Sequence, residues 1–299
     1  MKKYLLYILI FFAAVVAIDV CFGLTMDYMS RHAKSGDTKA SNALLYENEY
    51  DVLIMGSSRA HHHYDDKLLS DSLGLKVYNA GVDGNGIILA DGLYRILSQR
   101  YAPKLVIYDV EPAFDINIYA DDDNDRRYLS GLKPYFGEDE IKDIFSSYGW
   151  QEKVKNYSGL YRYNTDFFNV LKNFVSSSPV PEYGYIPTDG AMTEDKKPVS
   201  KGQSEIDSLK IQYIKTFISD VKASGAQLLL VASPKYGVPD SKVYDVVKAI
   251  CAENDVPFLD YYTDERFQKL EYFKEPMHLN GVGASEYTKR LVEELKTII

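Results

Sequence analysis

Residues 51–59 read Asp-Val-Leu-Ile-Met-Gly-Ser-Ser-Arg, a short apolar run that ends in a glycine and two serines. An apolar run of this length, closed by glycine, is typical of a buried strand. Four similar runs follow along the chain, at 76–81, 104–110, 227–233 and 257–262. Strands that are apolar on both faces need helices on both sides of their sheet, so the five runs predict a parallel sheet.

Segments with helical periodicity separate these runs, at 87–101, 204–224, 241–254 and 283–296. The segment 204–224 opens with a cap-like pair, Ser204 and Asp207, and Gly225 follows its end. Alternation of strands and helices predicts a three-layer α/β/α sandwich. We expect the five parallel strands in the flavodoxin-like order 2-1-3-4-5.

An apolar segment precedes the first strand. Residues 4–24 contain Asp19 as their only charge, and about 20 residues cross a bilayer core as a helix. Lys2 and Lys3 favour an N-terminus in the cytoplasm, with the rest of the chain exported. We therefore expect residues 1–24 to be a single-pass signal-anchor in the cytoplasmic membrane, with the rest of the chain on the outer side, periplasmic or extracellular. A cleaved signal peptide is the alternative.

The exported part is expected to comprise a polar juxtamembrane stalk at 25–50 and one α/β domain at 51–299. More than 100 residues separate the third and fourth strand runs, far more than a simple crossover needs. This predicts an insertion at 113–203 that is helical and rich in aromatic residues, with a charged loop at 120–127. The insertion either packs as a helical elaboration or forms a cap whose aromatic faces hold a sugar.

Composition narrows the classes of function. A net charge of -9 leaves no basic excess to neutralise phosphates, so we do not expect a nucleic-acid partner. The two cysteines, Cys21 and Cys251, exclude a disulfide scaffold and a cysteine-based zinc cluster. Chemistry that depends on histidine must use one of five residues: His32, His61, His62, His63 and His278.

Polar residues that can carry chemistry follow the ends of the predicted strands, where open α/β sheets bind their ligands. Ser58 follows the first strand and is placed as a nucleophile. The glycine-rich loop 79–86 follows the second strand, and its backbone amides can hold an oxyanion. His278 stands just before the last helix, with Glu275 three residues earlier to fix the imidazole tautomer.

This set of motifs resembles the SGNH (GDSL-type) hydrolases, a family named for its serine, glycine, asparagine and histidine. Residues 56–58 match the first block of the family, 79–84 the second and 275–278 the last. The resemblance covers the five strands, about half of the chain. It is closest to the membrane-anchored branch of the bacterial cell envelope, which includes alginate-acetylation and teichoic-acid D-alanylation proteins.

The resemblance implies a serine-dependent acyl-ester hydrolase or an O-acyltransferase. Its nucleophile would be Ser58, its base His278, its orienting acid Glu275 and its oxyanion donor Gly84, beside the Ser58 amide. The implied substrate is an acylated carbohydrate of the cell envelope or another small ester, and no cofactor or metal is implied. The alternative is a catalytically silent protein of the same fold that binds a glycan or assists assembly.

The chain departs from the family pattern in two ways. Glu275 stands where the family has aspartate, so the carboxylate sits on a longer arm. The Gly-x-Asn block after the third strand is absent, and Asp109 and Glu111 occupy that place. Either this absence argues against a standard esterase, or Asn85 or another donor substitutes for the missing asparagine. We also expect Arg59 to pair with the acids, because unpaired carboxylates would repel an oxyanion.

Two further alternatives concern the histidines. Asp260, at the end of the last strand, is a rival to Glu275 as the partner of His278. The run 61–63 raises a metal-dependent hydrolase as a third class. Three consecutive histidines in a loop do not converge on one ion through their spacing alone, so loop packing or substrate contacts are favoured.

Overall fold

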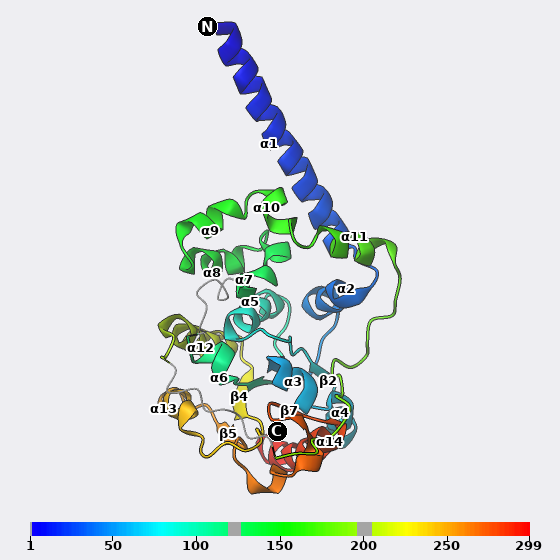
Figure 1. The fold of residues 1–299 in the computed structure, drawn as a ribbon, viewed down its shortest axis with the longest axis vertical. Coiled ribbons are helices and arrows are strands. Elements are labelled where there is room, and N and C mark those ends of the chain that lie inside the picture. Colours follow the sequence, from blue (N-terminus) through cyan, green and yellow to red (C-terminus); the bar gives the residue numbers. More distant parts are fainter. Residues whose placement is uncertain (1, 119–126, 196–204) are drawn as a thin grey trace. The chain divides into compact units, whose positions relative to one another are not determined.

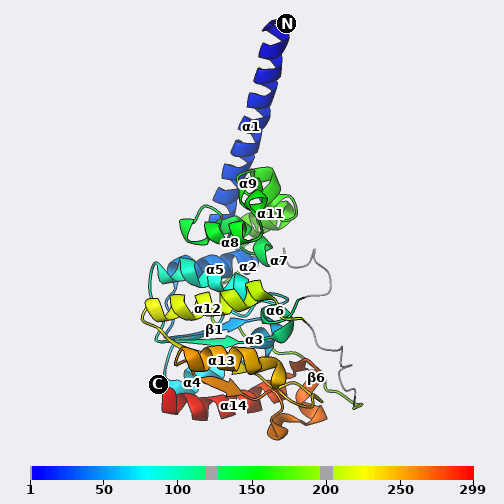
Figure 2. The same cartoon turned by 90° about the vertical axis from the view of Figure 1, so that its left-hand side faces the viewer.

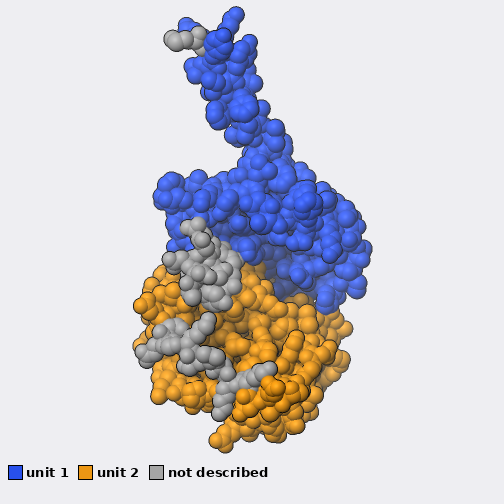
Figure 3. Space-filling model, in the orientation of Figure 1, with its two compact units in different colours: residues 1–48, 129–181 blue, residues 49–128, 182–299 orange. Residues whose placement is uncertain are grey.

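The structure is a computed structural model, and it describes residues 2–118, 127–195 and 205–299. The chain divides into two compact units (Figure 3). Unit 1 comprises residues 1–48 and 129–181, and unit 2 comprises residues 49–128 and 182–299.

Unit 2 is built on a five-stranded parallel sheet in the order β2-β1-β3-β4-β5, as predicted. Its strands are β1 (Val52–Gly56), β2 (Val77–Asn79), β3 (Leu105–Asp109), β4 (Gln227–Ala232) and β5 (Phe258–Asp260). Val52 is in register with both Val77 and Leu105, and Leu105 with Gln227. The strands therefore begin at one edge, and the loops that follow them gather at the other.

Helices cover both faces of this sheet (Figures 1 and 2). One face carries α5 (Ile87–Ser98) and α12 (Ser208–Ala223), and α12 contacts α13 (Asp245–Glu253). The other face carries α3 (Ser58–His63), α4 (Asp66–Leu73) and α14 (Gly281–Ile298). Helix α12 is capped by Asp207, whose carboxylate accepts hydrogen bonds from the amides of Leu209 and Lys210. Ser204, the other predicted cap residue, lies outside the described residues.

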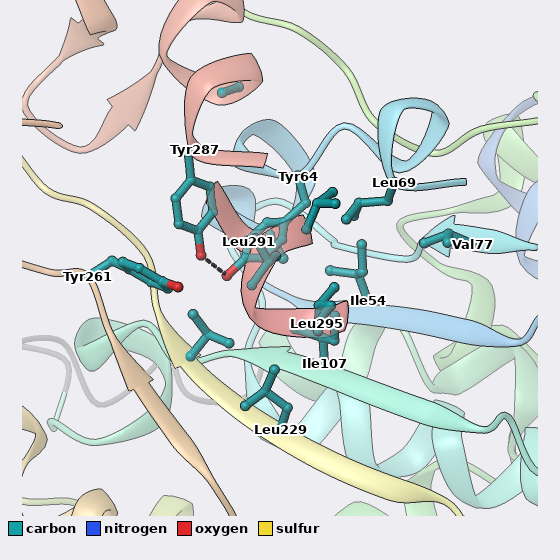
Figure 4. Close-up of a cluster of buried hydrophobic side chains, with 14 of the residues drawn as sticks. Ile54, Tyr64, Leu69, Val77, Ile107, Leu229, Tyr261, Tyr287, Leu291 and Leu295 are labelled. Carbon is teal, nitrogen blue, oxygen red and sulfur yellow. Dashed lines mark hydrogen bonds between the residues drawn. The ribbon is translucent and has the colours of Figure 1, made fainter. Parts of the chain in front are cut away.

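The main core lies between the sheet and α14. Figure 4 shows Ile54, Ile107 and Leu229 on three adjacent strands, with Leu291 and Leu295 of α14 against them. All five side chains are fully buried, and burial of each contributes roughly 1.5–3 kcal/mol. Tyrosines close one end of this core, where the Tyr287 hydroxyl donates to that of Tyr64 at 3.1 Å.

Short elements complete unit 2. They are α6 (Pro112–Asp115), the 3-10 helices Lys242–Tyr244, Glu265–Phe267 and Leu270–Tyr272, and the antiparallel hairpin of β6 (Phe273–Glu275) and β7 (His278–Leu279). The predicted helix at 241–254 is thus a 3-10 turn followed by α13. The hairpin was not predicted, because three- and two-residue strands leave no periodic pattern in the sequence.

Unit 1 is helical. It contains α1 (Lys2–Arg31), α2 (Gly36–Asn42), the π-helix Ala43–Glu47, the 3-10 helices Lys133–Tyr135 and Asp139–Ile141, α8 (Lys142–Ser147), α9 (Trp150–Lys155), α10 (Gly159–Tyr163) and α11 (Phe167–Val175); α7 (Arg127–Ser130) lies across the boundary between the units. Helix α1 is long and apolar enough to cross a membrane, with a mean hydropathy of 2.7 over its most apolar window. This confirms the prediction of a candidate membrane helix near the N-terminus.

Two predicted segments differ from the structure. Residues 25–50 are not a free polar stalk: α1 continues to Arg31, and the following helices bury Leu44 and Leu45. The predicted insertion 113–203 is divided, because 129–181 belong to unit 1 with the N-terminal helices and 182–195 belong to unit 2. Apolar residues scattered through the polar segment explain the first difference, since they find a core only after folding. The charged loop lies almost wholly outside the described residues.

Candidate active site

The turn from β1 into α3 places Ser58 at the loop-bearing edge of the sheet. Gly56 has φ +142, and a Cβ atom there would lie 2.6 Å from the carbonyl oxygen of Asp109, so only glycine fits. Ser57 is fully buried and caps α3 by accepting from the Arg59 amide at 3.4 Å. Ser58 follows as the first residue of the helix, with its side chain partly exposed.

The β6–β7 hairpin supplies an acid and an imidazole as a pair. Glu275 and His278 lie opposite each other across the hairpin, and His278 Nδ1 donates to Glu275 Oε1. The second oxygen, Oε2, accepts from the Met277 amide at 2.8 Å. Partial burial opposes ionisation, but the hydrogen bonds from His278 and Met277 lower the pKa of Glu275. An ionised carboxylate fixes the proton on Nδ1 and leaves the lone pair on Nε2.

That lone pair faces the serine. Ser58 Oγ donates to His278 Nε2 at 2.7 Å, across 220 positions of sequence. The structure therefore brings together Ser58, His278 and Glu275 in one line of hydrogen bonds, as the sequence led us to expect. The rival acid, Asp260, is engaged elsewhere: its carboxylate accepts from Lys248 Nζ at 2.6 Å and from the Tyr262 amide at 3.1 Å.

The glycine-rich loop after β2 lies against the start of α3. Asn79 is buried and holds the helix, donating to the carbonyls of Ala60 at 2.7 Å and Tyr64 at 2.9 Å. A Cβ atom at Gly81 would lie 2.4 Å from the backbone nitrogen of His61, so glycine permits this close packing. Gly84 follows in the loop with φ +68, while the side-chain amide of Asn85 donates to the Asp83 carbonyl at 3.1 Å. The oxyanion roles of Gly84 and Asn85 stay predictions.

A buried ionic network lies beneath the serine. Arg59 is fully buried, and its Nη1 donates to Glu111 Oε2 at 2.7 Å and to the Tyr244 hydroxyl at 3.1 Å. Its Nη2 lies 3.8 Å from Asp109 Oδ1. The expected pairing of Arg59 with the two acids that replace the Gly-x-Asn block is confirmed. Burial raises the pKa of Asp109, and the guanidinium counteracts it.

His63 is a residue whose part in the site the sequence analysis missed. It is fully buried, and the Leu279 amide donates to its Nε2 at 3.0 Å. Nδ1 must then carry the proton, which it donates to Ser233 Oγ at 2.9 Å. Burial lowers the pKa of His63 well below its usual range, so the ring is neutral. His63 thereby ties α3 to the end of β4 and to the strand that carries His278.

Residues 61–63 were assigned to a loop, whereas the structure places them in α3. A helical period would have separated them: Ser58, His61 and His62 share one face, and Arg59 and His63 share another. His61 Nδ1 lies 2.8 Å from Asp83 Oδ1, and His62 Nε2 lies 3.4 Å from the same oxygen. Hydrogen bonds from both rings lower the pKa of Asp83, and the bond to Asp83 raises that of His62.

This convergence, which the sequence spacing did not predict, has the chemistry of a metal site. One ligand atom each from His61, His62 and Asp83 lie within 4.8 Å of one another. His62 Nδ1 is held by the Ile186 carbonyl at 2.7 Å, and an outer hydrogen bond of this kind commonly orients a metal-binding imidazole. Two histidines and one carboxylate suit Zn²⁺ or Fe²⁺ with a position left open.

Comparison with known proteins adds no family assignment. No family model matches the chain, and a search of curated proteins finds no match. The function is therefore argued from the residues at this edge of the sheet. A separate cavity of about 360 Å³, lined by Leu105, Gln227 and Pro257 among others, lies where β3 and β4 begin and is remote from Ser58 in the sheet.

Proposed function

We propose that this protein is a serine-dependent acyl-ester hydrolase or O-acyltransferase. The observation that carries the proposal is the line of hydrogen bonds from Ser58 Oγ through the His278 ring to the Glu275 carboxylate. A hydroxyl that donates to an imidazole, whose other nitrogen donates to a carboxylate, is the arrangement that activates a serine.

In the first half-reaction, Ser58 Oγ attacks the carbonyl carbon of an ester while His278 Nε2 takes the hydroxyl proton. Glu275 stays ionised and stabilises the imidazolium that forms. The carbonyl oxygen becomes an oxyanion, which the backbone amides of Ser58 and Gly84 would receive. Collapse of this intermediate expels the alcohol, which takes the proton from Nε2, and leaves the acyl group on Ser58.

In the second half-reaction, a water molecule or a sugar hydroxyl attacks the acyl-enzyme and gives its proton to His278 Nε2. Water yields the free acid, so the protein is a hydrolase; a sugar hydroxyl yields a new ester, so it is a transferase. A candidate membrane helix at the N-terminus supports an acylated carbohydrate of the cell envelope as the substrate class, with the site on the outer side.

Labelling with a fluorophosphonate tests the activated serine directly. The full-length protein in detergent micelles is treated with the probe, and the modified residue is mapped by mass spectrometry, alongside turnover of p-nitrophenyl acetate. We expect Ser58 to be labelled, and Ser58→Ala to lose both label and turnover. Ser57→Ala is the matched control for label and turnover, because it removes the adjacent hydroxyl, which is fully buried. Loss of the helix cap in this variant should lower the stability by about 0.5–2 kcal/mol.

Equal turnover by the wild-type protein and Ser58→Ala would reject the mechanism. A folded protein that neither takes the label nor turns over any acyl ester is the result expected of the silent alternative, a glycan-binding or assembly protein. Addition of a soluble oligosaccharide to the assay separates the two enzyme classes, since only a transferase would move the acetyl group to it.

A metal-assisted hydrolase is the second candidate, and the group of His61, His62 and Asp83 favours it. In that case turnover would fall on chelation and return with Zn²⁺, and Asp83→Asn would lose activity as completely as Ser58→Ala. Chelator-resistant turnover with a labelled Ser58 would assign the chemistry to the serine alone.

A further inference from the structure

Helix α1 is held by unit 1 along one stripe. Every residue from 2 to 18 is exposed, and contact begins at Asp19. The buried or half-buried residues from there to residue 30 follow the period of a helix: Asp19, Phe22, Gly23, Met26, Asp27, Met29 and Ser30. Residues 19–31 of the helix therefore pack against the rest of unit 1, and residues 2–18 do not.

The contact at the level of Asp19 is polar and close. The Asp19 carboxylate accepts from Ser158 Oγ at 2.9 Å and from the Leu160 amide at 2.8 Å, which are groups at the start of α10. Four residues on, a Cβ atom at Gly23 would lie 3.0 Å from the Gly159 Cα, so the two backbones pack directly. Asp19 is thus a docking residue rather than a charge placed in lipid.

Docking at Asp19 shortens the free apolar segment. Residues 4–18 are 15 residues, which as an α-helix span about 22 Å at ~1.5 Å per residue. A bilayer core is about 30 Å thick. The free part of α1 therefore falls roughly 8 Å short of the core, and other residues must make up the difference.

Exposed apolar side chains stand beside the place where α1 leaves unit 1. They are Trp150 (69% exposed), Val154 (55%), Tyr157 (63%), Leu160 (48%) and Phe168 (79%), and we call this set the collar. Four of them lie on helices α9, α10 and α11, and Tyr157 lies between α9 and α10; Figure 1 shows these helices in the layer of unit 1 from which the free part of α1 extends.

Local contacts place three members of the collar, Tyr157, Leu160 and Phe168, beside the first turns of α1 that contact the rest of unit 1. Leu160 is the residue whose amide binds Asp19, and Tyr157 precedes the serine that also binds it. Phe168 packs on Phe167, whose ring stacks on Phe22 at 5.9 Å. On α9 the exposed residues Trp150 and Val154 are one turn apart, so they share a face.

We propose that the collar lies in the headgroup region of the same bilayer that α1 enters. Apolar side chains of helices at a membrane surface insert about 5–10 Å into the boundary between headgroups and acyl chains, and this depth matches the roughly 8 Å shortfall of α1. Tryptophan and tyrosine are the aromatic residues favoured at that depth. Lys172, exposed on α11, adds positive charge that anionic lipids attract, whereas the charge of Lys155 on α9 is paired with Glu152 at 3.0 Å. This assigns Trp150 and Tyr157 to lipid rather than to a sugar.

Trp150 is the only tryptophan of the chain, so its fluorescence reports on the collar alone. The full-length protein is reconstituted into vesicles of phosphatidylcholine and phosphatidylglycerol, with or without lipids brominated near the headgroup end of their chains. We expect brominated lipid to quench most of the Trp150 emission and aqueous iodide to quench little of it. Emission that iodide quenches freely and brominated lipid leaves unchanged would overturn the proposal.

Two variants in a Trp150→Phe background calibrate the measurement. Phe12→Trp, in the middle of the free segment, should be quenched by deeply brominated lipid, which shows that α1 is inserted. Tyr28→Trp, nine residues beyond Asp19 and 58% exposed, should remain open to iodide. Insertion of residue 12 with Trp150 in water would refute the collar specifically. If Trp150 is shielded from iodide only at high protein concentration, the collar binds another protein molecule. If soluble glycan shields it in the absence of lipid, the collar binds a sugar. Either result would refute the proposal as well.

Discussion

Replacement of Glu275 by glutamine tests the proton arrangement of the site more sharply than its removal. The Met277 amide donates to one oxygen of Glu275 at 2.8 Å, and this position keeps requiring an acceptor in the variant. The glutamine oxygen must therefore take that position, and its NH₂ group then faces His278 Nδ1. Nδ1 becomes an acceptor, so the proton moves to Nε2, the atom that should accept the proton of Ser58.

The expected effect is large because the wrong tautomer leaves no base. In serine enzymes, an acid-to-amide change of this kind lowers kcat by about 10⁴-fold. At about 1.4 kcal/mol per tenfold, this is roughly 5.5 kcal/mol of lost transition-state stabilisation. We expect Glu275→Ala to lose less activity, because the ring is then free to adopt either tautomer.

The assay compares kcat and kcat/KM for p-nitrophenyl acetate among wild type, Glu275→Gln and Glu275→Ala, with circular dichroism to check folding. Glu271→Gln, a nearby exposed glutamate, serves as the matched control and should retain full activity. A Glu275→Gln protein within tenfold of wild type, measured where Ser58→Ala is inactive, would refute the assignment of Glu275 as the orienting acid.

Three further changes should alter stability, measured by denaturant unfolding of the full-length protein in detergent. Arg59→Met leaves Glu111 buried without its counter-charge and should cost about 3–5 kcal/mol; a loss below about 1 kcal/mol would contradict a buried ion pair. His63 is neutral in the folded protein, so stability should fall as pH drops below about 6.5, by up to ~1.4 kcal/mol per pH unit from this residue, and His63→Gln should flatten that slope. Gly159→Leu places a side chain against the backbone of Gly23 and should cost about 1–3 kcal/mol, with faster proteolysis of α10; unchanged proteolysis would contradict the close packing.

The buried strands and the residues of the candidate site could be predicted from the sequence because their signals are local. Apolar runs such as 52–56 are buried in every residue, so composition alone identifies them. Ser58, Glu275 and His278 could be selected because each follows or precedes a predictable element. Parallel strands place their ends at one edge, which is why residues 220 positions apart were expected to meet.

Other features depend on contacts that no local pattern encodes. The helix α3 has only six residues and follows a serine cap, so it resembles a loop until Arg59 and His63 are seen to be buried on one face. The convergence of His61 and His62 on Asp83 requires the loop after β2 to pack against that helix. Asp19, which by sequence is a charge inside an apolar segment, is explained only by its partners in α10.

The sequence by itself determined the parallel α/β sheet, the apolar N-terminal helix and the identity of the three residues that line up at the edge of the sheet, Ser58, His278 and Glu275. Periodicity, composition and the order of elements along the chain are enough to predict these features. Tertiary structure decided which acid serves His278, which histidine is buried, and how far α1 is free to enter a membrane. Those choices depend on hydrogen bonds and packing between residues far apart in the chain, and such contacts exist only once the backbone has closed around them.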